Sequence, residues 1–255
     1  MAIAMKMQNS GYLARFRFYE GLNDFLPFDQ RKKELAHSFR GAPAIKDPIE
    51  ALGVPHTEID LILVNGASVG FAYGLRHGDR VSVYPRLKCF GNGPFVELRD
   101  AALRKDAFIL DVHLGKLAGT LRFLGFDIRY ENSYADPEIA RIAVDEKRIV
   151  LTRDRRLLFR KAITHAYFLR SSDPDRQLIE VFDRYDLYSR IKPYHRCRLC
   201  NGKIVEVGKQ EVFDRLEPKT VLYYDRFYRC EQCRKIYWKG SHYGRIKKHL
   251  GDLLA

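Results

Sequence analysis

Four cysteines near the C-terminal end place the strongest constraint on how this chain folds. They form two pairs, Cys197-x-x-Cys200 and Cys230-x-x-Cys233, separated by 29 residues. A Cys-x-x-Cys turn presents both sulfurs to one ion, so two such turns supply the four thiolates of a tetrahedral zinc site. The spacing leaves room for a strand hairpin between the turns. The sequence therefore predicts a zinc ribbon in which these four cysteines hold a structural Zn²⁺.

Two disulfides are the alternative use of the same cysteines. The first residues, MAIAMKMQNS, lack the apolar segment of a secretory signal, and Cys89 is a single additional cysteine. Disulfide frameworks belong mainly to secreted proteins, so this composition favours metal binding. The sequence also has no apolar run approaching the roughly 20 residues that span a bilayer. We therefore expect a cytoplasmic protein without a membrane partner.

The positive charge of the chain is unevenly distributed. The formal net charge is +13. Residues 1–85 carry an excess of only one basic residue, whereas residues 86–255 carry an excess of twelve. Such a basic region attracts polyanions, and the sequence shows no basic amphipathic helix or lipidation motif for a membrane surface. The charge pattern favours RNA or another nucleic acid as the partner.

Residues 11–85 have the pattern of a small α+β domain, to which we assign residues 1–88. The expected elements are strands over 12–19 and 33–40, a short helix capped by Asp47 before Pro48, a strand over 59–64, a tight turn at 65–66, a turn at 78–79 and a last strand over 80–84. This order, with the segments ALGVPHTEIDLILVNG and LRHGDRVSVYP, resembles the β-grasp fold of ubiquitin-like sulfur carriers.

The sulfur carriers act through a free C-terminal Gly-Gly. Here the last strand continues through Pro85 into more chain, and residue 255 is not preceded by Gly-Gly. We therefore expect the β-grasp domain to dock RNA or a protein partner, or to serve a structural role. A sulfur-carrier-related scaffold that recruits an enzyme is a weaker alternative.

After a Gly- and Pro-containing linker at 89–94, strands and helices alternate along the chain. The expected elements are strands over 107–111, 126–130, 148–152 and 166–169, and helices over 114–124, from 136 onward and over 175–188. This order predicts a parallel sheet with helices on both faces. We assign the α/β domain to residues 95–192 and the zinc ribbon with its basic C-terminal segment to residues 193–255.

Acidic residues follow two of these strands. Asp111 and Asp154 lie at strand ends, and Asp136 begins the helix between them. The functional crevice of an open parallel sheet lies beyond the carboxyl ends of its strands, so the three carboxylates are expected to converge there. Mg²⁺ or Mn²⁺ prefers such oxygen ligands and can activate water for phosphodiester hydrolysis. The sequence thus predicts a catalytic metal site.

Each aspartate also has a structural alternative. Asp111 and Asp136 are candidates for helix caps, and Asp154 for the start of a turn. Further candidates for the acidic site are Glu138, Asp173 and Asp175, although the last two also fit an ordinary helix start. The basic residues around the third acid, which are candidates for binding substrate phosphates or else a solvated helix start, are Arg153, Arg155 and Arg156.

Several segments together resemble the Mut-seven C-terminal RNase domain family. They are FILDVHLGKLAGTLRFLGFD, ADPEIARIA with RIVLTRDRRLL, RCRLCNGKI and YRCEQCRKIYWKGSHY. The resemblance implies a PIN-like nuclease fold with a zinc ribbon, a ubiquitin-like N-terminal extension, and metal-dependent RNA cleavage with acids at Asp111, Asp136 and Asp154. The chain departs from the family pattern in two places. Val112-His113-Leu114-Gly115 replaces Gly-Met-Leu-Gly, and Gly119-Thr120 replaces an Arg-Trp pair.

Aromatic and basic residues alternate after the second cysteine pair. Trp238 and Lys239 belong to this run, which is suited to stacking on unpaired bases and neutralising phosphates. The structural alternative is that the aromatic residues complete the small core of the ribbon. We expect a metal-dependent ribonuclease; the alternative is a non-catalytic RNA-binding adaptor that uses the ribbon and the basic surface.

Overall fold

The computed structural model describes residues 11–85, 95–98 and 107–254 of the chain, which divides into two compact units. The first unit comprises Met1–Ala102 together with Leu158–Ala166, and the second comprises Leu103–Leu157 and Tyr167–Ala255. The linker expected at 89–94 and Cys89 lie outside the described residues. The three domain ranges proposed from the sequence therefore stay predictions.

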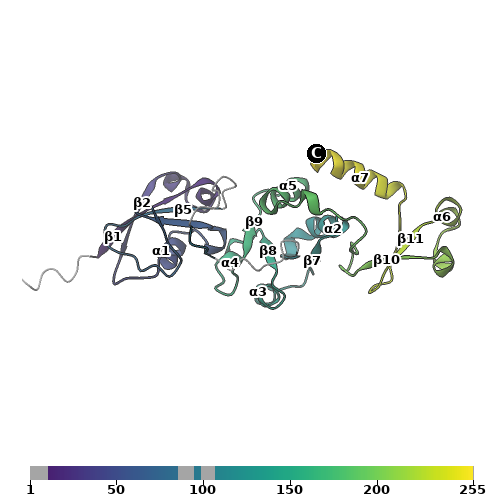
Figure 1. Ribbon diagram of the computed structural model, residues 1–255, viewed down its shortest axis with the longest axis horizontal. Helices are drawn as coiled ribbons and strands as arrows, with labels where there is room; N and C mark the ends of the chain where they lie inside the picture. Colours follow the sequence, from purple (N-terminus) through teal and green to yellow (C-terminus); the bar gives the residue numbers. More distant parts are fainter. Residues whose placement is uncertain (1–10, 86–94, 99–106, 255) are drawn as a thin grey trace, which may run out of the picture. The chain divides into compact units, whose positions relative to one another are not determined.

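The N-terminal part forms a five-stranded β-grasp sheet in the order β2-β1-β5-β3-β4 (Figure 1). Its elements are β1 (Tyr12–Phe18), β2 (Glu34–Phe39), α1 (Lys46–Ala51), β3 (Leu61–Val64), β4 (Ala67–Ser68) and β5 (Arg80–Tyr84). The central strands β1 and β5 are parallel, and β2 and β3 run antiparallel to them. This arrangement confirms the predicted ubiquitin-like fold.

Local sequence explains most of these elements. Alternate residues of β1 are buried, as expected for a strand with one face on the core. Asn65 and Gly66 have φ of 51° and 88°, which is the left-handed backbone of a two-residue hairpin between β3 and β4. The predicted cap is wrong, because α1 begins at Lys46 with Ile45 as its N-cap. Pro48 is tolerated there because amides in the first helical turn lack intrahelical partners.

The α/β domain forms a four-stranded sheet in the order β7-β6-β8-β9, in which β7, β6 and β8 are parallel. Its elements are β6 (Ala107–Leu110), α2 (Gly115–Phe123), β7 (Asp127–Arg129), α3 (Asp136–Asp145), β8 (Ile149–Thr152), α4 (Arg155–Leu158), β9 (Ala166–Phe168) and α5 (Pro174–Tyr185). Helices α2 and α5 pack together on one side of the sheet, and α3 lies on the other (Figure 1). Every residue of β6 and β8 is buried, as expected for central parallel strands covered on both faces.

The ribbon forms a three-stranded antiparallel sheet in the order β10-β11-β12. Its elements are β10 (Ile204–Val207), α6 (Pro218–Tyr223), β11 (Phe227–Cys230) and β12 (Ile236–Trp238), followed by α7 (Ser241–Leu254). The expected hairpin between the cysteine pairs is present as β10 and β11, with two 3-10 turns and α6 inserted between its strands. None of the helices in the described ranges is long and apolar enough to cross a membrane.

Polar contacts join the first cysteine turn to the edge strand β7. The Asp127 carboxylate accepts hydrogen bonds from Asn201 Nδ2 at 2.8 Å and from Arg196 at 3.2 Å. Asn201 Oδ1 in turn accepts the Ile128 amide at 2.9 Å. The buried guanidinium of Arg122 donates to the carbonyl oxygen of Leu199 at 2.6 Å. These bonds place the ribbon beside α2 and β7.

Candidate functional site

The carboxyl ends of β6 and β8 lie next to each other in the sheet. The chain leaves β6, forms β7 on one side of it, and returns to form β8 on the other side. Such a reversal of strand order opens a crevice at the carboxyl ends, where open α/β sheets bind their ligands. Asp111 follows β6 directly, and Asp154 lies two residues beyond β8. The structure therefore brings these two predicted residues to the same edge of the sheet.

Asp111 is buried and fully engaged in hydrogen bonds. The residue is only 4% exposed to solvent. Oδ1 accepts the His113 amide at 2.8 Å, and Oδ2 accepts the Arg153 amide at 2.7 Å. The first bond caps the 3-10 turn Val112–Leu114, and the second fastens the end of β8 to the end of β6. Asp111 thus has the capping role that the sequence left open.

Thr152 links the two aspartates and was missed by the sequence reasoning. Its hydroxyl donates to Asp111 Oδ2 at 2.5 Å and accepts the Asp154 amide at 2.8 Å. The Thr152 side chain is completely buried. A threonine that ends an apolar strand gives no signal for this role, because the bond joins residues 41 positions apart.

Asp154 is half-buried and directly precedes α4. Its Oδ1 accepts the Arg156 amide at 2.8 Å, which is a helix-start bond. The three neighbouring arginines, Arg153, Arg155 and Arg156, do not all face the same part of the molecule. Arg153 lines the cleft described below, Arg155 lies 5.5 Å from the centre of the Phe168 ring, and Arg156 is exposed. Only the first of these arginines therefore faces the cleft directly.

Asp136 is the first residue of α3 and is half-buried. The alternative that it caps the helix is wrong, because the N-cap is Ala135 and no side chain caps this helix. Proline is tolerated at either of the first helical positions, so the Asp-Pro pair did not fix the starting residue. Among the described residues, the three aspartates do not form a group whose ligand atoms lie within 4.8 Å of one another.

The additional acids proposed for the metal site lie at the starts of two helices. Asp173 caps α5, because its Oδ1 accepts the amides of Asp175 and Arg176 at 3.1 and 3.0 Å. This confirms the helix-start interpretation of that segment. Glu138 lies in the first turn of α3 and is half-buried.

A cleft of about 660 Å³ opens at this edge of the sheet. It lies beside the starts of α2 and α5, and its basic lining residues are His113, Lys116 and Arg153. The amides at helix starts and the basic side chains both favour anions. The cleft is therefore suited to a phosphate group next to the buried Asp111 carboxylate.

The four paired cysteines form a second site in the ribbon. Their sulfur atoms all lie within 4.8 Å of one another, and none of the four is in a disulfide. The sulfurs of Cys197 and Cys233 are 3.5 Å apart, as are those of Cys200 and Cys230. The thiols thus have the arrangement of a metal-binding cluster, and the disulfide alternative is wrong for these residues.

The backbone around the cysteines explains how the cluster forms. Asn201 and Arg234, which each follow a Cys-x-x-Cys turn, have φ of 66° and 61°. These left-handed residues turn the chain back so that both sulfurs of a pair face the same point. A Cβ atom at Gly202 would lie 2.8 Å from the Cys230 sulfur, so only glycine allows this close approach.

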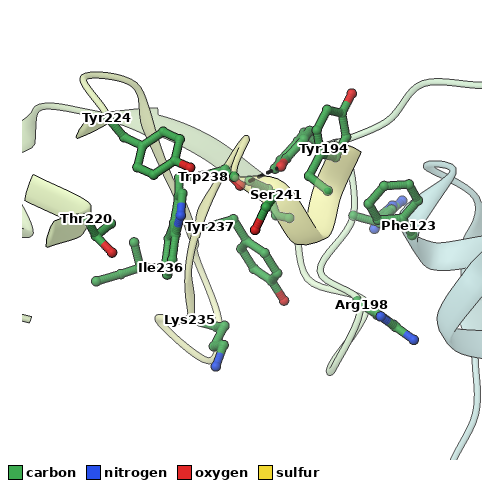
Figure 2. A pocket seen from close by; sticks show the side chains of 14 residues that line it. Phe123, Tyr194, Arg198, Thr220, Tyr224, Lys235, Ile236, Tyr237, Trp238 and Ser241 are labelled. Atoms are coloured by element: carbon green, nitrogen blue, oxygen red, sulfur yellow. Dashed lines mark hydrogen bonds between the residues drawn. The ribbon is translucent and has the colours of Figure 1, made fainter. Parts of the chain in front are cut away.

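Trp238 lines an aromatic pocket of about 600 Å³ (Figure 2), and Lys239 follows it in the sequence. The Trp238 ring lines the pocket and also packs against the ribbon core of Val212, Phe227 and Ile236. The structural alternative for this aromatic run is therefore confirmed for Trp238. The Lys239 ammonium lies 5.9 Å from the centre of the Tyr194 ring.

Comparisons with known proteins agree with this architecture. Residues 106–250 match the family model of the Mut7-C RNAse domain, and residues 11–90 match the Mut7-C ubiquitin model. The crystal structure of the H. volcanii small archaeal modifier protein 1 is similar over 30% of this chain and 100% of its own, at 15% identity and a TM-score of 0.25. No curated protein matches the chain.

Proposed function

Because the chain belongs to the Mut7-C RNAse domain family, we propose that it is a metal-dependent ribonuclease that hydrolyses RNA phosphodiester bonds. The observation that carries this proposal is the linked pair of Asp111 and Asp154, which Thr152 joins at the carboxyl ends of neighbouring parallel strands. The pair lies beside a cleft with basic lining residues. An acidic centre next to an anion-binding cleft is what phosphodiester hydrolysis needs.

The residues have distinct roles in this proposal. Arg153 and Lys116 hold the RNA phosphate in the cleft. Asp136 and Asp154 are the half-buried carboxylates that contribute ligand oxygens, and Asp111 adds a third negative charge while it fixes the ends of both strands. Bound Mg²⁺ or Mn²⁺ would acidify a water and stabilise charge on the phosphate. The carboxylate donors suit these ions, whereas the spacing of the acids does not form a closed ligand set.

A non-catalytic RNA-binding adaptor is the second candidate. It is favoured by the hydrogen bonds of Asp111 and Asp154, which each accept a backbone amide and thereby act as caps. In this case the basic surface binds RNA with an affinity that decreases steeply with salt, and no cleavage occurs.

The variant Asp154→Asn separates the two functions. Its side-chain oxygen can still accept the Arg156 amide, and Thr152 bonds to the backbone of residue 154, so the fold is expected to persist. Loss of the negative charge should lower the cleavage rate about a hundredfold or more. Cleavage of labelled single-stranded and structured RNA is measured with Mg²⁺, with Mn²⁺ and without added metal.

The matched control is Asp145→Asn, an exposed acid at the far end of α3. It should cleave RNA at the wild-type rate. Equal cleavage by Asp154→Asn and wild-type protein would remove the proposed site, and RNA binding without cleavage under every condition would favour the adaptor.

We assign structural Zn²⁺ to the four thiols. Tetrahedral zinc with Zn–S bonds of about 2.3 Å separates its sulfurs by about 3.8 Å. The observed separations of 3.5 Å and the limit of 4.8 Å for all pairs support this assignment. We further propose a cytoplasmic location, in keeping with unpaired thiols, and a protein partner for the β-grasp domain.

A further inference from the structure

Three neighbouring hollows follow one side of α2. The cleft at the sheet edge shares Lys116 and Pro174 with a middle hollow of about 440 Å³. The middle hollow shares Phe123 and Arg198 with the aromatic pocket of the ribbon. The three hollows therefore adjoin one another along α2, from its start to its last residue.

The aromatic pocket has walls of ring systems. Tyr194 and Tyr243 have ring centres 5.1 Å apart, and Phe123 lies 5.7 Å from Tyr243. The Trp238 ring stands on the opposite side of the pocket, next to Tyr224 (Figure 2). The Tyr194 hydroxyl donates to the Trp238 carbonyl oxygen at 2.9 Å and holds the two sides together. Flat rings on two sides suit a flat ligand.

The charged residues that line this pocket are all basic. They are Arg196, Arg198 and Lys235, of which Arg196 is paired with the Asp127 carboxylate at 3.2 Å. None of the fourteen described residues that line it is acidic. In the middle hollow, Lys116 and Arg198 face Asp173 and Asp175, but the Asp173 carboxylate is engaged in capping α5. A polyanion with flat groups fits the whole path better than an uncharged or a cationic ligand does.

Arg198 reaches α2 because a glycine leaves space for it. A Cβ atom at Gly119 would lie 3.3 Å from Arg198 Nε. Gly119 is one of the positions at which the chain departs from the expected Arg-Trp pair. The positive charge at this point of the helix is therefore supplied by the cysteine turn instead of by α2.

We propose that the three hollows form one track for single-stranded RNA, in which the aromatic pocket holds an unpaired base and the strand runs along α2 to the cleft. This inference rests on the proposed function and adds its substrate class. Unpaired bases expose the faces that stack on aromatic rings, whereas a duplex hides them. Helix α2 has nine residues and spans about 13 Å, which corresponds to a few nucleotides.

The single tryptophan of the chain, Trp238, reports on the track directly. The full-length protein carrying Asp154→Asn is titrated with a single-stranded RNA oligonucleotide and with a duplex of the same sequence. Base stacking in the pocket should quench Trp238 fluorescence with the single strand and not with the duplex. This titration measures RNA binding and does not depend on cleavage. If the protein is not a nuclease, quenching by the single strand is still expected; if the track is wrong, quenching is absent even when the wild-type protein cleaves RNA.

Two variants test the contacts. Tyr243→Leu keeps an apolar side chain but removes the ring, and should weaken single-strand binding about tenfold, whereas Tyr243→Phe should bind normally. Arg198→Ala should lower the slope of log affinity against log salt by about one. The control Lys203→Ala changes an exposed lysine outside the three hollows and should leave that slope unchanged. Three results would overturn the proposed track. They are equal quenching by the single strand and the duplex, no quenching by either RNA, and unchanged single-strand affinity in both Tyr243→Leu and Arg198→Ala.

Discussion

Among single residues, Asp127 has the clearest electrostatic role. Burial opposes its charged form, but hydrogen bonds from Arg148 and Asn201 and the charge of Arg196 lower the pKa of Asp127 to about 2, from 3.8. The carboxylate is therefore more stable in the folded protein than in the unfolded chain. Because the folded pKa is depressed, this stabilisation is complete above pH 3.8 and is lost as the pH falls towards 2.

We predict that Asp127→Asn lowers the free energy of unfolding by about 2 kcal/mol at pH 7. The difference from wild type should be the same at pH 7 and pH 5, since both lie above the titration range, and should decrease only below pH 4. Urea unfolding of both proteins at these pH values measures this difference in the free energy of unfolding. Asp225→Asn, at an exposed ion pair with Lys209, is the control and should cost less than about 1 kcal/mol. A cost that already changes between pH 7 and pH 5 would contradict the assignment.

At the scale of elements, the ribbon depends on its cysteine cluster. Within the described part of the chain its core contains three buried apolar residues, Val212, Phe227 and Ile236, which is too little burial for independent stability. Burial disfavours the Cys197 thiolate, but a hydrogen bond from Tyr237 and the amides of Cys200 and Leu199 lower its pKa to about 7. The surroundings of Cys197 thus favour its thiolate, whereas burial raises the pKa of the Cys230 thiol and raises that of Cys233 to about 12.

If the four thiols bind Zn²⁺ as proposed, its removal should unfold the ribbon, because zinc binding contributes about 10 kcal/mol or more to such small folds. Cys197→Ser is expected to have the same effect. The measurement is the emission of Trp238, which should shift to the red as the indole leaves the pocket and meets water. The control Cys89→Ser, outside the two pairs, should keep the wild-type spectrum. An unchanged spectrum after chelation would show that the apolar core alone holds the ribbon.

At the scale of the whole molecule, a segment of the nuclease-like sequence belongs to the N-terminal unit. Leu158–Ala166 follows α4 and lies in the same compact unit as the β-grasp domain. His56 Nε2 donates to the Ile163 carbonyl oxygen at 2.9 Å, and Thr57 Oγ1 donates to the Leu158 carbonyl oxygen at 3.4 Å. His56 is only 4% exposed. Within this unit, His56 and Thr57 therefore hold the segment Leu158–Ala166 by two hydrogen bonds.

We predict that His56→Ala releases this segment. The buried Ile163 carbonyl would lose its donor, at a cost of about 1–3 kcal/mol. Limited digestion with trypsin should cut faster after Arg160 or Lys161, the basic residues of the segment. His77→Ala changes an exposed histidine of the same domain and should leave the cutting rate unchanged. If trypsin cut His56→Ala no faster than His77→Ala, His56 would not hold the segment.

The sequence alone specified the features that depend on near neighbours. The apolar runs of β6 and β8, the helical repeat of α2 and the tight turn at Asn65-Gly66 were all predicted from local pattern. Local pattern could not locate the first residue of α1 or α3. Every amide in the first helical turn lacks an internal partner, so an Asp-Pro pair fits several starting positions equally well.

The tertiary structure alone decided which distant groups meet. The bond between Thr152 and Asp111 joins residues 41 positions apart, that between Ile128 and Asn201 spans 73, and that between His56 and Ile163 spans 107. Sequence spacing identified Asp111, Asp136 and Asp154 as candidates but did not show that the first caps a turn or that Thr152 links it to the third. Secondary structure follows from preferences of residues a few positions apart, whereas hydrogen bonds and clefts between segments exist only once the strands and helices have packed.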